Sequence, residues 1–138
     1  MVNMATKELR CKSVRMDNLS GAGTANYHIW KWSPQRDIKI YKVFMCLDMP
    51  DAQAGTAWVW LSKGAVDMDN PADEPNEEEM IFALQHLTSD ATTPNNVRAF
   101  FDFHDKYIEI EDGETVVLTT RQPATNNMGI GLIIYYTP

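Results

Sequence analysis

The chain has 138 residues, 44% of them hydrophobic, and a formal net charge of −7. This length fits one domain that buries its own core, and the hydrophobic content excludes a chain that is disordered throughout. The acidic balance argues against direct nucleic-acid binding, which requires a basic surface.

The N-terminal half predicts strands joined by short loops. No apolar segment of the signal-peptide type follows Met1, so we expect synthesis in the cytoplasm, and no apolar run has the roughly twenty residues of a membrane helix. Residues 1–16 form an extended arm or an edge strand in this interpretation. Alternating apolar residues between turn signals predict strands over 27–32, 38–47 and 57–61. The apolar phase slips between Ile40 and Tyr41, which predicts a β-bulge.

An acidic loop follows, over residues 67–79. It contains seven acidic residues and no basic one, and it accounts for the whole net charge. Counted as a calcium loop from Asp67, it has Pro71 at a ligand position and Ala72 where the turn needs glycine, which excludes an EF-hand. A solvated loop is favoured, with looser binding of a hard cation as the alternative.

Residues 76–87 predict one short helix. Asn76 is a suitable N-cap, three glutamates occupy the first turn, and apolar residues recur at helical spacing, at Met80, Ile81, Leu84 and Leu87. A strand is the alternative for this segment.

The last forty residues alternate apolar and polar positions three times. Phe101 and Phe103 begin the pattern, and residues 128–136 end it. Asp112-Gly113 is typical of a tight hairpin turn. The whole chain therefore predicts an all-β fold in a single domain, 1–138: an antiparallel β-sandwich or jelly roll of about eight strands with one short helix.

Several strands are apolar on both faces. They include the strand from Ala57 to Leu61, Val43–Leu47 and Leu132–Tyr136. One face packs on the domain's second sheet, and the other needs a second cover: the helix, a ligand or a partner subunit. We expect a homo-oligomer. The candidate contact residues, in decreasing order, are Trp58, Trp60, Tyr135 and Tyr136, with Trp30 and Trp32 as a further aromatic pair.

The two tryptophan pairs have an alternative role. Trp30 and Trp32 share one face of a strand, as do Trp58 and Trp60. Burial in the core is favoured, but an exposed pair would stack on sugar rings.

Nothing in the sequence resembles a catalytic or cofactor motif. Asp102 and His104 share one strand face, so a carboxylate–imidazole pair for metal or base chemistry is the catalytic alternative, although a strand end and turn is favoured. Cys11 and Cys46 lie within expected strands and predict buried free thiols. Gly129 and Gly131 alternate within the last strand, and predict close approach by another backbone or a bulky ring, such as a tryptophan. We expect no enzyme activity, no cofactor and no metal ligand.

Residues 108–118 and 128–136 resemble the end of single jelly-roll proteins of viruses and phages, in which a short hairpin with glycine precedes a long final strand. The resemblance covers the last third of the chain and implies a capsid, decoration or vertex subunit without catalysis. Coat proteins that enclose a genome commonly carry a basic arm. In this chain the N-terminal segment has only four basic residues, Lys7, Arg10, Lys12 and Arg15, too few for such an arm. This favours an outer position in the particle, with the segment anchored to an acidic neighbour.

The sequence therefore predicts a structural protein of a viral particle that acts by self-association. Its partners would be further copies and other particle proteins, without direct nucleic acid or membrane contact, and it would move from the host cytoplasm to the virion. The alternative is a carbohydrate-binding β-sandwich with a glycan on a surface tryptophan pair. A third interpretation is a metal-dependent enzyme that uses His104 and Asp102.

Overall fold

The computed structural model describes residues 8–19, 27–49, 55–64, 80–88, 95–121 and 128–138. Over these ranges the chain forms nine strands and no helix: β1 (Arg10–Leu19), β2 (Tyr27–Trp32), β3 (Ile38–Met49), β4 (Gly55–Gly64), β5 (Met80–Thr88), β6 (Asn95–Asp102), β7 (Ile108–Ile110), β8 (Thr115–Arg121) and β9 (Met128–Thr137). In this part of the chain, no helix is long and apolar enough to span a membrane.

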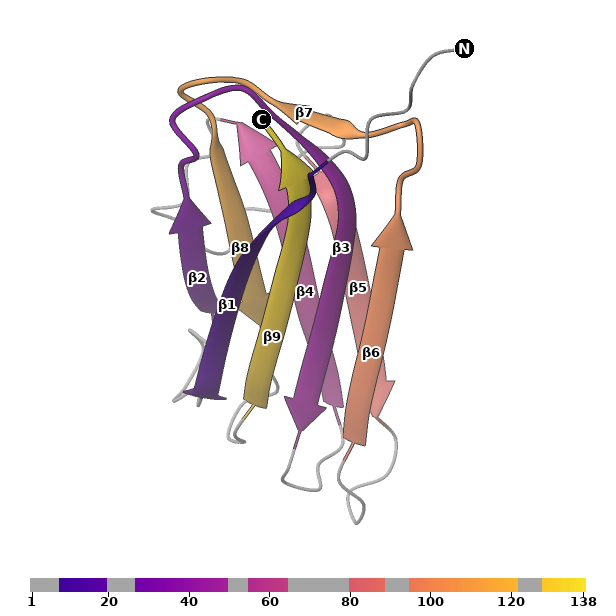
Figure 1. Cartoon of the computed structure of the whole chain (residues 1–138). Coiled ribbons are helices and arrows are strands. Elements are labelled where there is room, and N and C mark those ends of the chain that lie inside the picture. The colour runs from indigo at the N-terminus through magenta and orange to yellow at the C-terminus, as the bar shows by residue number, and fades with distance from the viewer. Residues whose placement is uncertain (1–7, 20–26, 50–54, 65–79, 89–94, 122–127) are drawn as a thin grey trace.

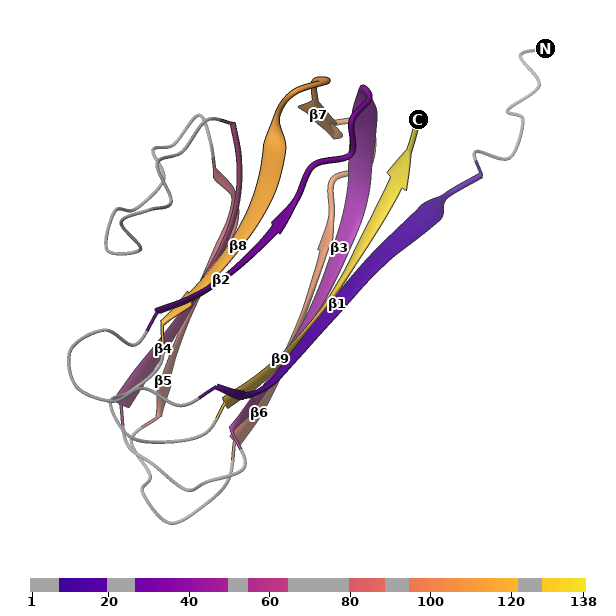
Figure 2. The same ribbon diagram turned by 90° about the vertical axis from the view of Figure 1, so that its left-hand side faces the viewer.

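The strands form two antiparallel sheets that face each other (Figure 2). Sheet A has the order β1-β9-β3-β6, with β7 also paired to β3, and sheet B has the order β2-β8-β4-β5. The pairing is nested along the sequence, because β1 pairs with β9, β2 with β8, β3 with β6 and β4 with β5. This is the strand arrangement of a jelly roll, so the predicted antiparallel sandwich is confirmed.

The core lies between the inner faces of the two sheets. Val43, Met45 and Leu47 of β3 are fully buried, and their side chains alternate with the outward-facing residues of the same strand. Two aromatic pairs connect the sheets. Phe82 of β5 stacks on Phe101 of β6, with ring centroids 4.5 Å apart, and Trp32 of β2 meets Tyr136 of β9.

The predicted helix over 76–87 is wrong, because Met80–Thr88 forms β5 and pairs with β4. Residues 76–79 lie outside the described residues. The β4–β5 register shifts so that Phe82 is opposite Leu61 and Met80 is opposite Ser62. Ile81 is therefore an extra residue on β5, and both Ile81 and Phe82 are buried. This irregularity removes the strand alternation that would have identified the segment.

The predicted bulge in β3 is confirmed. Ile40 pairs with Tyr136 and Lys42 with Tyr135, so Tyr41 is the additional residue. Ile40 and Tyr41 are both buried, which is the phase slip seen in the sequence.

The predicted turn at Asp112-Gly113 also forms. Gly113 has a φ of +94°, and the Glu114 amide donates to the Glu111 carbonyl at 2.9 Å. The carboxylate of Asp37 accepts a hydrogen bond from the Asp112 amide at 2.8 Å. Glycine is favoured at such a backbone conformation because it has no Cβ.

Candidate functional site

The three tryptophans whose side chains the structure describes are half-buried or buried. Trp30 and Trp32 are half-buried and pack against the core, so in β2 the favoured interpretation holds and the pair forms no open sugar platform. Trp60 is only 6% exposed, which leaves little of it for a partner. The side chain of Trp58 lies outside the described residues.

The centre of the outer face of sheet B is buried within the single chain, whereas Ala83 and Lys31 on its edge strands are exposed. Trp60 belongs to this face, and its neighbours Ser62, Val117 and Thr119 are also buried. The second cover that the two-faced strand β4 requires is therefore present without a partner subunit.

The outer face of sheet A is different, because apolar side chains remain accessible on it. Figure 1 shows this sheet in front, with its outer face toward the viewer. Pairing of the four strands aligns Ser13, Ile133, Phe44 and Phe100 across the sheet. We call Ile133, Phe44 and Phe100 the apolar row. Ile133 and Phe44 are half-buried, and Phe100 is 57% exposed.

The adjacent tyrosines of β9 face opposite ways. Tyr136 points inward to Trp32, whereas Tyr135 lies on the outer face of sheet A, between Cys11 and Lys42 on the neighbouring strands. Of the residues predicted as contacts, Tyr135 is therefore the one that the described structure places beside the apolar row.

A hollow of about 210 Å³ lies on the other side of the apolar row, over Gly131. We call it the Gly131 hollow; its lining includes Ser13, Arg15, Phe44, Cys46 and Ile133. A Cβ at position 131 would lie 3.9 Å from the Cys46 Cβ, an ordinary contact. The fold therefore tolerates a side chain here, and its absence leaves the surface open.

The close approach predicted at the two glycines occurs at Gly129, but it does not come from a tryptophan. The nearest atom to a Cβ there is Oδ1 of Asp17 at 3.3 Å, followed by the Asp48 Cβ and the Met16 carbonyl oxygen at 3.7 Å. The neighbours are strands β1 and β3.

Charged side chains surround the apolar row. Arg15 and Arg98 lie on the Gly131 side, and Lys42 and Asp102 lie on the Tyr135 side. Arg15 Nε donates to both carboxylate oxygens of Asp17 at 2.9 Å each. This hydrogen bond, together with the charge of Asp17, raises the pKa of Arg15. Among the described residues, no ion pair joins Arg98.

The two cysteines are free, but the expectation that both are buried is wrong. Cys11 is exposed on the edge strand β1, and Cys46 is half-buried beside the Gly131 hollow. Both lie on the outer face of sheet A because they share the strand parity of Ser13 and Phe44. A cysteine in a strand need not be buried when that strand has an open face.

The Asp102–His104 pair forms a turn. The Asp102 Oδ1 accepts a hydrogen bond from the His104 amide at 3.0 Å, and it lies 3.7 Å from His104 Nδ1. His104 has a φ of +52°, and its side chain is largely exposed. The Lys106 amide donates to the Phe103 carbonyl at 2.9 Å, so a turn follows β6 as favoured. Among the described residues, no group of three His, Cys, Asp or Glu side chains is placed to hold a metal ion.

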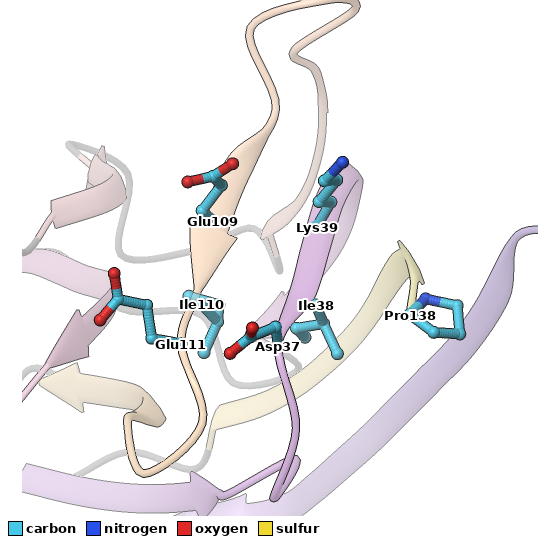
Figure 3. A pocket seen from close by; sticks show the side chains of 7 residues that line it. All are labelled: Asp37, Ile38, Lys39, Glu109, Ile110, Glu111 and Pro138. Carbon is cyan, nitrogen blue, oxygen red and sulfur yellow. The ribbon is translucent and has the colours of Figure 1, made fainter.

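A further cavity of about 230 Å³ lies at the end of the sandwich, between β3, β7 and the C-terminus (Figure 3). Asp37, Glu109 and Glu111 give it an acidic lining, and Lys39 of β3 is the cross-strand partner of Glu109. Two of its polar groups are engaged in the fold: Asp37 holds the Asp112 amide, and the Glu109 carbonyl accepts from Lys63 Nζ at 2.8 Å. The Asp37 carboxylate stabilises the turn, and the Lys63–Glu109 hydrogen bond joins β4 to β7. We assign no ligand to this cavity.

Phe44, Phe100 and Arg98 were not predicted as surface residues. The signal for Phe100 was present, because Phe101 and Phe103 alternate as inward residues and Phe100 must then face outward. No signal in the sequence indicates the apolar row itself, because predicting the row requires knowing which strands are neighbours in the sheet.

No protein-family model and no curated protein sequence matches the chain. Among solved structures, it is similar to a protein of the Bacillus endospore appendages, described as a novel family of disulfide-linked pili, with 12% identity and a TM-score of 0.49 over 95% of this chain and 88% of that one. It is also similar to a chain of tomato aspermy virus, with 15% identity and a TM-score of 0.48 over 94% of this chain and 78% of that one. At this level, neither likeness carries an argument about function.

Proposed function

We propose that the protein is a non-enzymatic structural subunit that self-associates through the outer face of sheet A. The assembly it builds or decorates is a viral particle, as the C-terminal resemblance implies, or a similar multi-subunit structure. The proposal depends on the apolar row and not on any catalytic group.

The exposed phenyl ring of Phe100 is the observation that carries the proposal. It continues the apolar row of Ile133 and Phe44 across three adjacent strands. Covering the accessible part of one such ring contributes about 2–3 kcal/mol, and a second copy would bury the same surface on both subunits. Contiguous apolar surface of this kind usually marks an interface.

Two features of strand β1 favour association through the face rather than through the sheet edge. Lys12 points toward the inside of the sandwich, and its Nζ lies 5.7 Å from the centre of the Trp32 ring. The β1–β9 register also breaks between Met16 and Leu19. Inward-pointing charges and bulges are features that block pairing between exposed edge strands.

Sedimentation equilibrium of the full chain over a wide concentration range tests the proposal. We expect concentration-dependent self-association, and we expect Phe100→Ser to weaken it by about tenfold or more, because one apolar anchor is lost from each copy. Ala83→Ser is the matched control, since it places serine at an exposed position of sheet B. A wild-type protein that stays monomeric at every concentration would contradict the proposal. So would equal weakening by the two substitutions.

A further inference from the structure

We infer that two copies dock face to face around a two-fold axis that runs along the apolar row, with Tyr135 of each copy in the Gly131 hollow of the other. This inference rests on the proposed function and adds the geometry of the contact. It follows from the order of residues on each strand of sheet A.

Each strand of sheet A has one residue in the central row. The residues two positions before and two positions after it lie on the same outer face. On β9, Ile133 lies between Gly131 and Tyr135, and on β6, Phe100 lies between Arg98 and Asp102. A rotation of 180° about the row places each strand over its own copy in the opposite direction. Position 135 then faces position 131 of the second copy, and position 98 faces position 102.

The shapes of the two sides match under this rotation. Tyr135 carries a large, half-buried ring on the outer face, and Gly131 has no side chain beneath a hollow of about 210 Å³. Ile133, Phe44 and Phe100 each meet their own counterpart at the axis. Packed sheets lie about 10 Å apart, which is the separation that interdigitating side chains of this size fill.

One pair of opposite charges matches as well. Arg98 of one copy faces Asp102 of the other, and the symmetry produces this contact twice. Within one chain the two residues are four positions apart on an extended strand, roughly 13 Å, so they do not neutralise each other. A two-fold axis parallel to the strands would instead place Arg98 against Arg15, which lies in the same row, and would leave Asp102 opposite Cys11.

The area of the face sets the strength of the contact. Four strands about 4.8 Å apart and about ten residues long cover roughly 600 Å², so two faces bury about 1,200 Å². This value is at the lower end for specific interfaces, and it predicts a weak dimer that becomes stable when further contacts of a larger assembly are added.

Charge exchange tests the arrangement. We expect Arg98→Glu to raise the dimer dissociation constant about tenfold, because two attractions become two repulsions. Asp102→Arg has the same effect, and the double variant R98E/D102R restores dimerisation. Lys31→Glu is the control, since it makes the same charge change at an exposed position of sheet B. Thermal unfolding of each variant separates a loss of contact from a loss of fold.

A double-mutant cycle tests the ring and the hollow. Gly131→Ala places a methyl group in the hollow without strain in the fold, and we expect it to weaken dimerisation of the wild type but not of the Tyr135→Ala variant. Position 135 does not reach position 131 within one strand, so coupling between the two substitutions reports a contact between copies.

The outcomes separate the inference from the proposed function. A dimer that Arg98→Glu strengthens has the axis parallel to the strands, which overturns the inference and leaves the proposed function in place. A dimer that no substitution at these four positions affects also overturns the inference alone. A wild-type protein that never dimerises overturns both.

Discussion

The ring of Trp32 in β2 meets the ring of Tyr136 in β9 edge-on, with centroids 5.1 Å apart and planes inclined by 61°. This contact joins sheet B to sheet A at the side of the sandwich where Lys12 lies over the same tryptophan. The neighbouring Tyr135 faces the opposite side, away from the core. Of the two adjacent tyrosines, Tyr136 therefore packs in the interior, and Tyr135 lies on the outer face of sheet A.

Replacing each tyrosine by alanine shows how much each one contributes to the free energy of unfolding. We expect Tyr136→Ala to lower the free energy of unfolding by about 2 kcal/mol, because it removes a half-buried ring and its aromatic partner. Tyr135→Ala should cost less than about 1 kcal/mol. Urea unfolding at a low protein concentration measures both values without a contribution from self-association. Similar losses for the two variants would show that Tyr135 also belongs to the fold.

Gly113 and Gly131 differ in what they require of the backbone. Gly113→Ala should lower the free energy of unfolding by about 1 kcal/mol, because position 113 has a φ of +94°. Gly131→Ala, at an extended strand position with room for a Cβ, should be neutral or raise this free energy by up to about 1 kcal/mol. Thermal and urea unfolding check the pair. Equal destabilisation would contradict this assignment of the two glycines.

Thr120 is fully buried, and its hydroxyl has no hydrogen-bond partner among the described residues. We expect Thr120→Val to raise the free energy of unfolding by about 1 kcal/mol, because a methyl group of the same size needs no partner. Thr115→Val is the control, since the Thr115 hydroxyl lies 2.8 Å from the Ser33 hydroxyl and nothing is gained by removing it. Destabilisation by Thr120→Val would mean that this hydroxyl is hydrogen-bonded in solution.

The sequence predicts the fold class because turn residues clearly separate the segments in which apolar and polar residues alternate. The bulge at Ile40–Tyr41 and the turn at Gly113 can both be predicted from the sequence, since each has a local signal: two consecutive apolar residues in one case and an Asp-Gly pair in the other. Local marks of this kind do not depend on which strands become neighbours.

The error at β5 has the same physical origin as the success at β3. The extra residue Ile81 interrupts the alternation, and Met80, Ile81 and Leu84 then fall at helical spacing. Pairing with β4 overrides this local preference, and tertiary context of this kind cannot be read from a short segment.

The candidate surface was only half predictable. The two-faced composition of the β3 and β9 segments was evident, and it correctly indicated apolar residues outside the core. The row forms because β9 lies between β1 and β3 while β6 lies beyond β3, and this order is a property of the whole topology. The sequence places Trp60 above Tyr135 as a contact residue, because it does not show that the centre of the outer face of sheet B is buried.

The nested pairing has a consequence for the timing of assembly. Ser13 and Ile133 are partners in the ladder between β1 and β9, so one side of sheet A joins segments from opposite ends of the described chain. Such long-range pairing closes large loops and is slow. Ile133, Tyr135 and Gly131 all belong to β9, so a chain in which β9 has not yet paired with β1 and β3 carries no complete apolar row. Under the proposed function, association through this face would then be restricted to subunits in which sheet A is complete.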